Sequence, residues 1–291
     1  MIEFKVNKLY SGKKLDRALE AFYPNANRNT LFRALRNKDV KINGTRTSQN
    51  SYVNEGDCVQ IYMDVDVVTT IDNPYEVVFA DENIIIVNKK QGIAVQQDKH
   101  GEVCLIDLIR KEFGNDCGLC HRLDRNTGGL VIIGRTQEAT DVLIGIIQGR
   151  EISKYYHCLV HGKMPYNSDT LTGWLFKDAK NSSVLVYDFQ KMNCLEIKTA
   201  YQVLDHDIKK KFSKIEVDLL TGRTHQIRAH MAHINHPVIG DGKYGTNEIN
   251  SKFKLKYQAL WAVRLEFHLK DKLGLLGYLN NAIFTTETAF I

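Results

Sequence analysis

The residues best suited to chemistry lie in one run, His121-Arg122-Leu123-Asp124-Arg125-Asn126-Thr127-Gly128-Gly129. A single carboxylate, that of Asp124, stands there between two arginines and precedes a Gly-Gly turn and an apolar run. Loops at strand edges are where proteins usually display functional groups, and nearby guanidinium groups favour an ionised carboxylate. We therefore expect Asp124 to act as a nucleophile or base. The alternative interpretation is an aspartate that serves the turn and a surface ion pair.

Two later blocks carry further candidates. The first is Lys154-Tyr155-Tyr156-His157-Cys158-Leu159-Val160-His161-Gly162, and the second runs from 220 to 231 and contains Arg223 and Arg228. If residues 225–234 form a helix, the apolar residues cluster on one side and Arg228 lies on another. Arg228 is then expected to point away from the core, although an ordinary surface helix shows the same pattern.

Cysteine and histidine spacings suggest two other kinds of site. Cys117-Gly118-Leu119-Cys120-His121 has the spacing for covalent haem attachment, and its two cysteines also fit a redox pair or half of a zinc site. No second cysteine pair completes four zinc ligands. Four histidines also gather, at His225, His230, His233 and His236. No obvious third ligand accompanies them, so we expect neither a metal nor a cofactor.

The elements that must position these groups follow from the apolar patterns. Strand-like runs fall at 77–80, 84–88, 129–133, 156–160, 183–186, 215–219 and 260–267. Helical patterns fall at 105–113, 139–148 and 225–234. Many strands with few, scattered helices predict an α+β domain with a mixed, largely antiparallel sheet.

The first sixty residues predict a separate small α/β unit. Leu15, Leu19 and Phe22 recur at helical spacing, and Asn29-Thr30 can cap a second helix. On that second helix Arg33 and Arg36 face away from the core. Val40-Lys41-Ile42 then meets Asn43-Gly44, a strong hairpin signal because both residues tolerate positive φ. We expect domains at 1–65 and 76–291, joined by a linker at 66–75.

Composition and charge narrow the class of protein. The chain has 291 residues, of which 43% are apolar and 25% charged, as in ordinary globular proteins. Its apolar runs are too short to cross a bilayer, and Met1-Ile2-Glu3-Phe4-Lys5 lacks the pattern of a secretory signal. We therefore expect a cytoplasmic protein with reduced cysteines and no membrane partner.

The net charge of +5 is concentrated near the N-terminus. Residues 1–62 carry eleven basic and six acidic side chains, so the remainder of the chain balances to zero. A small basic region joined to a neutral larger one suggests a module that grips a polyanion. A solvated surface of mixed charge is the alternative.

The ordered motifs resemble those of a known family. His-Arg-Leu-Asp-x-x-Thr-x-Gly-Leu at 121–130 closely resembles the signature of the RluA-type pseudouridine synthases. The blocks at 154–162 and 220–231 look like that family's tyrosine-bearing strand and arginine-bearing helix start, and 78–89 and 236–245 continue the match. Two positions depart from the pattern: Gly128 replaces a usual serine and Lys90 a usual proline. The resemblance thins after about residue 270.

This resemblance implies a role for each residue. Asp124 would be the catalytic aspartate, which attacks the ribose anomeric carbon or assists departure of the uracil. Arg122 would enter the RNA helix in place of a flipped uridine, and Tyr156 would stack on the uracil. Arg228 would pair with Asp124, and Arg223 is a second candidate for that pairing or for a phosphate contact.

The N-terminal region resembles the RNA-binding module named after small-subunit ribosomal protein S-four. The matching stretch runs from 12–16 through 40–44 to 56–57. In that family the second helix and the hairpin hold structured RNA. The resemblance implies that the corresponding basic residues contact RNA here, namely Arg28, Arg33, Arg36, Lys38 and Lys41.

Together these observations predict a monomeric enzyme that converts uridine to pseudouridine in structured RNA. Large-subunit ribosomal RNA is the favoured substrate, because a basic module adds backbone grip around the target, and transfer RNA is the alternative. Two competing hypotheses stay open. One is an RNA chaperone or assembly factor with a vestigial site, and the other is a haem or metal protein.

Overall fold

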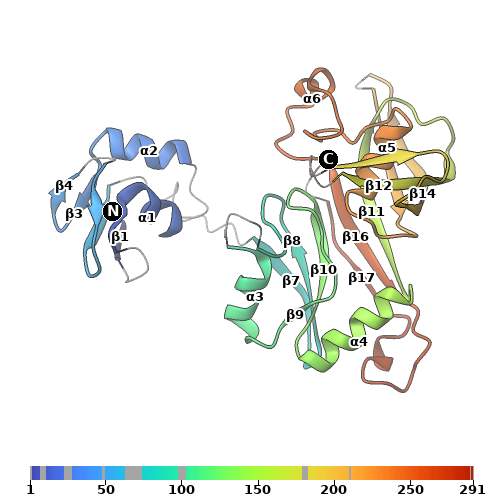
Figure 1. Cartoon of the computed structure of the whole chain (residues 1–291), viewed down its shortest axis with the longest axis horizontal. Coiled ribbons are helices and arrows are strands. Elements are labelled where there is room, and N and C mark those ends of the chain that lie inside the picture. Colours follow the sequence, from blue (N-terminus) through green and yellow to red (C-terminus); the bar gives the residue numbers. More distant parts are fainter. Residues whose placement is uncertain are drawn as a thin grey trace. The chain divides into compact units, whose positions relative to one another are not determined.

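The chain forms two compact units, Met1–Asn73 and Pro74–Ile291. The computed structural model (Figure 1) describes residues 2–6, 11–22, 28–47, 50–62, 74–97, 103–178, 183–209, 211–288 and 290. No helix in these ranges is long and apolar enough to cross a membrane.

The N-terminal unit packs two helices against a small sheet. Its elements are β1 (Ile2–Lys5), β2 (Lys13–Lys14), α1 (Leu15–Phe22), α2 (Arg28–Arg36), β3 (Val40–Ile42), β4 (Thr45–Arg46), β5 (Tyr52–Val53) and β6 (Cys58–Ile61). The described strands pair in the order β1-β6-β3-β4, with β2 on β5. Leucines from both helices, including Leu15 and Leu35, are at most 2% exposed and pack on Val40 and Ile61.

Two predictions for this unit have different outcomes. The hairpin is confirmed: Asn43 and Gly44 have φ of 50° and 80°, and Ile42 pairs with Thr45. The predicted cap of the second helix is wrong, because α2 already begins at Arg28. Asn29 and Thr30 therefore lie inside its first turn rather than before it.

The larger unit is built on one sheet, as the strand-rich sequence predicts. Its strands are β7 (Tyr75–Ala80), β8 (Ile84–Lys89), β9 (Gly118–Leu119), β10 (Gly128–Gly134), β11 (Ile152–His161), β12 (Ser168–Asp178), β13 (Ser183–Tyr187), β14 (Cys194–Asp207), β15 (Phe212–Asp218), β16 (Leu260–Phe267) and β17 (Ile283–Thr285). Its helices are α3 (Leu105–Phe113), α4 (Gln137–Gln148), α5 (Gln226–His233) and α6 (Asn247–Phe253), with a 3-10 turn at Gly277–Leu279.

The strand order confirms the predicted fold class. Described strands form one sheet of order β13-β12-β14-β15-β11-β16-β10-β8-β7, with β9 on β10 and β17 on β16. Among them β10 and β16 alone run parallel. The protein is therefore an α+β protein with a mixed, largely antiparallel sheet.

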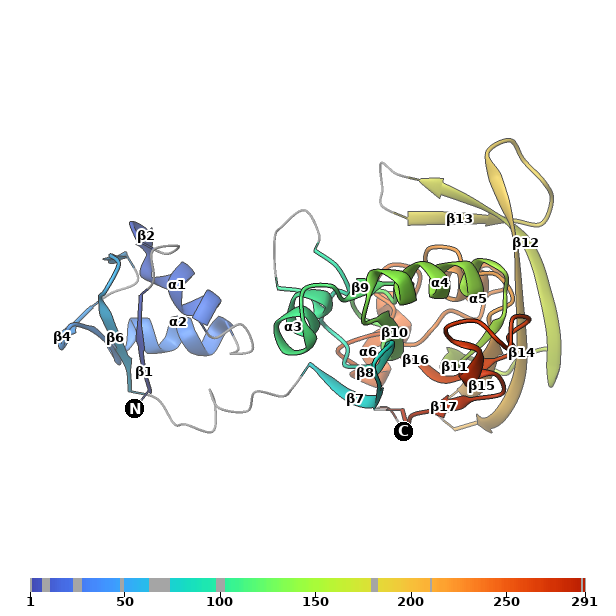
Figure 2. The same ribbon diagram turned by 90° about the horizontal axis from the view of Figure 1, so that it is seen from below.

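Helices cover both faces of the sheet at β8 and β10. This explains why both strands are continuous apolar runs rather than alternating ones. On one face Val87 and Val131 belong to the core cluster that includes the buried residues of α3, and on the other Ile86 and Ile132 belong to the cluster that includes Leu143 of α4. Figure 2 shows β12, β13 and β14 extending beyond this covered region.

Candidate active site

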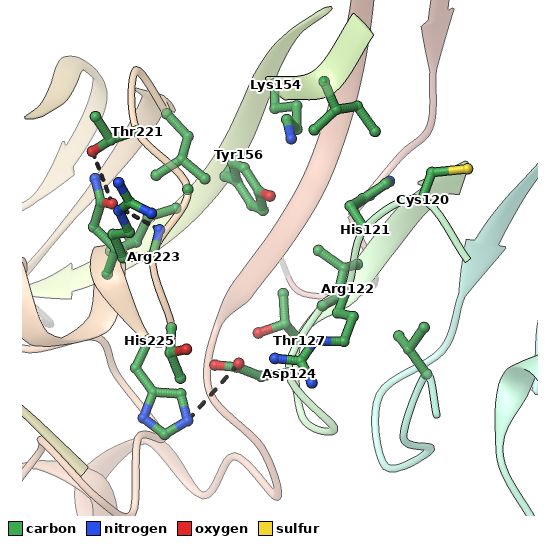
Figure 3. Close-up of a pocket in the computed structure, with 18 of the residues that line it drawn as sticks. Cys120, His121, Arg122, Asp124, Thr127, Lys154, Tyr156, Thr221, Arg223 and His225 are labelled. Atoms are coloured by element: carbon green, nitrogen blue, oxygen red, sulfur yellow. Dashed lines mark hydrogen bonds and ion pairs between the residues drawn. The ribbon is translucent and has the colours of Figure 1, made fainter. Parts of the chain in front are cut away.

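A large cleft opens between β11 and the two predicted motif segments, one around Asp124 and one around Arg228. It has a volume of about 1260 Å³. Its walls come from the loop before β10, from β11, and from the segment that leads into α5. Figure 3 shows Asp124, Arg122, Tyr156 and His225 around this space. The structure therefore brings the three sequence motifs to one cavity.

Asp124 is held in the cleft by Arg228, which lies 104 positions later in the chain, on α5. Nη1 of Arg228 donates to Oδ2 of Asp124 at 2.7 Å. The same guanidinium donates through Nε and Nη2 to the two carboxylate oxygens of Asp241, at 2.7 and 2.9 Å. Asp241 is fully buried, whereas the side chain of Asp124 is 26% exposed. One guanidinium thus connects a buried carboxylate to one that faces the cleft.

The charges of this triad reinforce one another. Burial alone would lower the pKa of Arg228, but the hydrogen bonds and charge of Asp241, and then those of Asp124, raise it above its ordinary value. Burial would likewise raise the pKa of Asp241, but the guanidinium lowers it. Arg228 therefore stays positively charged. Its Nε and Nη2 bind Asp241, and its Nη1 is left to bind Asp124.

The expected orientation of Arg228 is wrong in one respect. Ile227 and Met231 do pack in the core, but Arg228 is itself only 7% exposed rather than directed outward. The reason is Asp241, whose buried carboxylate gives the guanidinium a partner inside the protein. Asp241 was not among the expected site residues, although it lies within the 236–245 block that resembles the family.

Asp241 and α5 are fixed by a second set of contacts. Backbone N–H groups of Lys243 and Tyr244 donate to Oδ1 of Asp241 at 2.8 and 3.1 Å. The hydroxyl of Tyr244 hydrogen-bonds Nδ1 of His225 at 2.8 Å. Nε2 of His225 lies 3.9 Å from Oδ1 of Asp124, and burial lowers the pKa of this histidine while Asp124 opposes that shift.

A buried lysine, Lys89, hydrogen-bonds the loop that carries Asp124. Lys89 is fully buried, and its Nζ donates to the carbonyl oxygens of Lys90, Ile93 and Arg125 at 2.9, 3.0 and 3.2 Å. Burial lowers the pKa of Lys89 to about 7, and the charge of Asp124 opposes that shift. Lys89 therefore ties the residue after Asp124 to the end of β8, a role that sequence reasoning missed.

Two glycines let β10 approach β16 closely beside this loop. A Cβ on Gly128 would lie 2.2 Å from the ring of Trp261, and one on Gly129 would lie 2.2 Å from the carbonyl oxygen of Ala262. Gly129 also has a φ of 110°. The Trp261 ring thus occupies the space that a side chain at position 128 would need, where the family usually has a serine.

Tyr156 forms the opposite wall of the cleft. It lies on β11, pairs with Val217 and Ala262 of the neighbouring strands, and is 5% exposed. Burial, and then the charge of Asp124, raise the pKa of its hydroxyl, which therefore stays protonated at neutral pH. A flat, buried aromatic ring facing the cleft can stack on a nucleobase.

Two more arginines line the cleft without pairing to Asp124. Arg122 and Arg223 are both exposed, and within the described residues neither forms an ion pair with that carboxylate. Arg228, and not Arg122 or Arg223, provides the charge partner of Asp124. The two guanidinium groups are thus exposed at the cleft.

The basic residues of the N-terminal unit are on its surface. Arg33, Arg36 and Lys38 are exposed, and Nζ of Lys41 hydrogen-bonds the hydroxyl of Tyr62 at 3.2 Å. The side chain of Arg28 lies outside the described residues.

The candidate cysteines and histidines are not arranged as a metal site in the described parts of the chain. Across the described ranges, no three His, Cys, Asp or Glu side chains are grouped to hold a metal. Cys117 is buried, and Nε2 of His121 accepts the backbone N–H of Ile132 at 3.0 Å. The ring nitrogen of the Cys-x-x-Cys-His string is thus engaged by the backbone of β10.

Comparison with known proteins gives the class. The sequence model of the family described as RNA pseudouridylate synthase matches residues 83–233, more than half of the chain. An uncharacterised RNA pseudouridine synthase of Mycoplasma genitalium is 30% identical over 91% of this chain and 88% of its own length. Ribosomal large subunit pseudouridine synthase D of Escherichia coli (strain K12) is 29% identical over 80% of this chain and 73% of its own.

Solved structures show the same fold. Human RNA Pseudouridylate Synthase Domain Containing 1 superposes with a TM-score of 0.59 at 23% identity, over 67% of this chain and 79% of that one. Fold and sequence together define the class of RNA pseudouridine synthases. The chain belongs to the RNA pseudouridylate synthase family and is of the RluA type.

Proposed function

We propose that this enzyme isomerises specific uridines of structured RNA to pseudouridine, with Asp124 as the catalytic carboxylate. The observation that carries the proposal is the triad of Asp124, Arg228 and Asp241, in which a buried guanidinium directs a single carboxylate into the cleft. The reaction needs such a group, because the bond from uracil N1 to ribose C1′ must break. Asp124 either attacks C1′ or stabilises the positive charge that develops there.

The cleft must receive a uridine that has left its helix. Extruding a nucleotide costs a few kcal/mol, part of which stacking can offset. Tyr156 offers a ring for the uracil, and the exposed Arg122, which lines the cleft, would fill the vacated space in the RNA. Arg223 at the same rim is suited to a phosphate contact.

The proposed substrate is large-subunit ribosomal RNA. Two features support it: relatives such as the Escherichia coli protein carry that substrate in their names, and the N-terminal unit bears exposed basic residues. Phosphate contacts from Arg33, Arg36, Lys38 and Lys41, and from Arg28, would position the RNA while the cleft selects the uridine. We expect the enzyme to work as a cytoplasmic monomer without a metal.

Mapping pseudouridines in cellular RNA tests this function. Cells that lack the gene should lose one or a few pseudouridines from large-subunit ribosomal RNA, and the wild-type gene should restore them. The Asp124→Asn gene should not restore them, whereas Asp116→Asn, which changes an exposed carboxylate outside the cleft, should. An unchanged pseudouridine map in the deletion strain would refute the proposal, and loss from transfer RNA alone would refute the substrate.

A further inference from the structure

Lys154 shares a wall of the cleft with Tyr156 but has no role in the function proposed above. The two residues are two positions apart on β11, so both side chains lie on the same face of that strand; the irregularity in its pairing with β16 between Tyr155 and Tyr156 falls on Val263 of β16. Both line the cleft. Tyr155 between them faces the other way. Cζ of Arg264 lies 3.9 Å from the centroid of the Tyr155 ring. Figure 3 shows the amine of Lys154 directed into the space beside the Tyr156 ring, on the side away from Asp124.

The amine of Lys154 has no counter-ion in the part of the chain that the structure describes. No carboxylate lies within ion-pair distance of it there. Its neighbour across the cleft is His121, whose pKa burial lowers to about 3, with the charge of Lys154 adding to that shift. His121 is therefore neutral and supplies no negative charge.

A partly buried ammonium without a partner is a costly arrangement. Burial lowers the pKa of Lys154 below its ordinary value, which measures this cost. An anion that enters the cleft would remove it, because opposite charges attract strongly where water is excluded. The ammonium of Lys154 can therefore bind a negative charge next to the ring proposed to stack on uracil.

The isomerisation creates an anion of the required kind. When the N1–C1′ bond breaks, its electron pair stays on N1, and conjugation spreads the charge to the carbonyl oxygens O2 and O4. The base must then turn by half a rotation about its N3–C6 axis so that C5 takes the place of N1. The same turn exchanges O2 and O4. A donor fixed beside one carbonyl position therefore meets an oxygen both before and after the turn.

We propose that Lys154 is a further catalytic residue, whose ammonium binds the carbonyl oxygen of the detached uracil anion. It contacts one carbonyl before the turn and the other after it, and it holds the base in the cleft between the two bonds. The C5–C1′ bond then forms with electrons of the base, the C5 proton leaves and N1 gains a proton. Lys154 keeps its own proton throughout. This inference rests on the proposed isomerase function.

The test uses the full chain and a large-subunit ribosomal RNA transcript labelled with tritium at uridine C5. Each isomerisation releases the label to water, so a single-turnover rate can be measured apart from RNA affinity. We expect Lys154→Met to lower that rate about 100-fold or more, the usual loss when one donor to a developing anion is removed, with RNA affinity within threefold. Lys154→Arg, which keeps the charge, should recover most of the rate. Lys163→Met, an exposed lysine outside the cleft, should match the wild type.

Three outcomes would overturn the inference. A Lys154→Met rate within threefold of the wild type would show that the charge is not needed. An equal loss of rate and affinity would indicate a phosphate contact instead. If Lys154→Met fails to fold, a Lys154→Gln variant that folds and retains the rate would have the same meaning. Absence of tritium release by the wild type would instead refute the proposed function, so the two failures are distinguishable.

Discussion

At the scale of single residues, Arg228 performs two tasks with one planar group. Its Nε and Nη2 hold Asp241, and its remaining Nη1 holds Asp124. A lysine has a single ammonium on a flexible chain and cannot reproduce this fork. The direction in which Asp124 points therefore depends on a guanidinium and on a buried carboxylate that never meets the substrate.

Arg228→Lys tests this dependence. We expect the single-turnover rate to fall about 100-fold or more, because a displacement of about 1 Å at a reacting group can cost that much. Arg264→Lys is a matched control, since Arg264 also pairs with two carboxylates, Glu216 and Glu266. It does not line the cleft and should leave the rate unchanged. Equal rates for the two variants would contradict the role of Arg228.

The same residues show what sequence could predict of the site. Asp124, Tyr156 and Arg228 were expected together and do line one cleft. Asp241 and Lys89 were not expected, because their roles depend on burial. A lysine at a strand end and an aspartate between glycines look like surface residues until the fold surrounds them. Both are fully buried.

At the scale of elements, strongly patterned segments were the predictable ones. The seven expected strands and three expected helices of the larger unit are present, with ends shifted by a few residues. The short strands β9 and β17, the long strands β12 and β14, and the helix α6 were missed. β12 and β14 extend where few residues cover them, so much of their surface is exposed and carries polar and charged side chains. Their buried positions are few, and those of β14 include the polar Thr199, so the apolar alternation that marks a strand is weak in both.

His121 links the Asp124 loop to β10 and makes stability depend on pH. Its Nε2 accepts the N–H of Ile132, so the folded protein needs the neutral ring. Burial lowers its pKa from 6.5 to about 3. Between these values the unfolded chain binds a proton that the folded chain does not, so stability is complete above about pH 6.5 and falls as the pH falls toward 3.

Denaturant unfolding at several pH values checks this linkage. Between pH 6.5 and 4, the wild type should lose up to about 1.4 kcal/mol per pH unit more than His121→Gln, the limit for one proton. His268→Gln changes an exposed histidine and should follow the wild type. If the His121→Gln and wild-type curves ran parallel, the acceptor role of His121 would be wrong.

At the scale of the whole molecule, the cleft and the basic residues of the N-terminal sequence lie in different units of the chain. The unit Met1–Asn73 has its own core, and the unit Pro74–Ile291 contains every residue of the cleft. The sequence predicts this division, because the first 62 residues are basic and the helices and strands expected there are short.

Removing residues 1–73 should therefore leave a folded catalytic unit that binds RNA more weakly and with less dependence on salt. Counterion release explains the second effect, since each phosphate contact contributes about 0.7 to 0.9 to the slope of log affinity against log salt. In the full chain, Arg33→Gln with Arg36→Gln should reduce that slope by about 1.4 to 1.8. Lys5→Gln, on the exposed surface of β1, is the control. An unchanged slope would exclude phosphate contacts by these arginines.

The most direct test of the account measures one rate with and without the Asp124 carboxylate. Wild type, Asp124→Asn and Asp116→Asn are each mixed in excess with a large-subunit ribosomal RNA transcript labelled with tritium at uridine C5. We predict that Asp124→Asn binds the transcript within a few-fold of the wild type but releases tritium at least about 1000-fold more slowly. Asp116→Asn should release it at the wild-type rate. Tritium release by Asp124→Asn within tenfold of the wild type would contradict the claim that this carboxylate performs the chemistry.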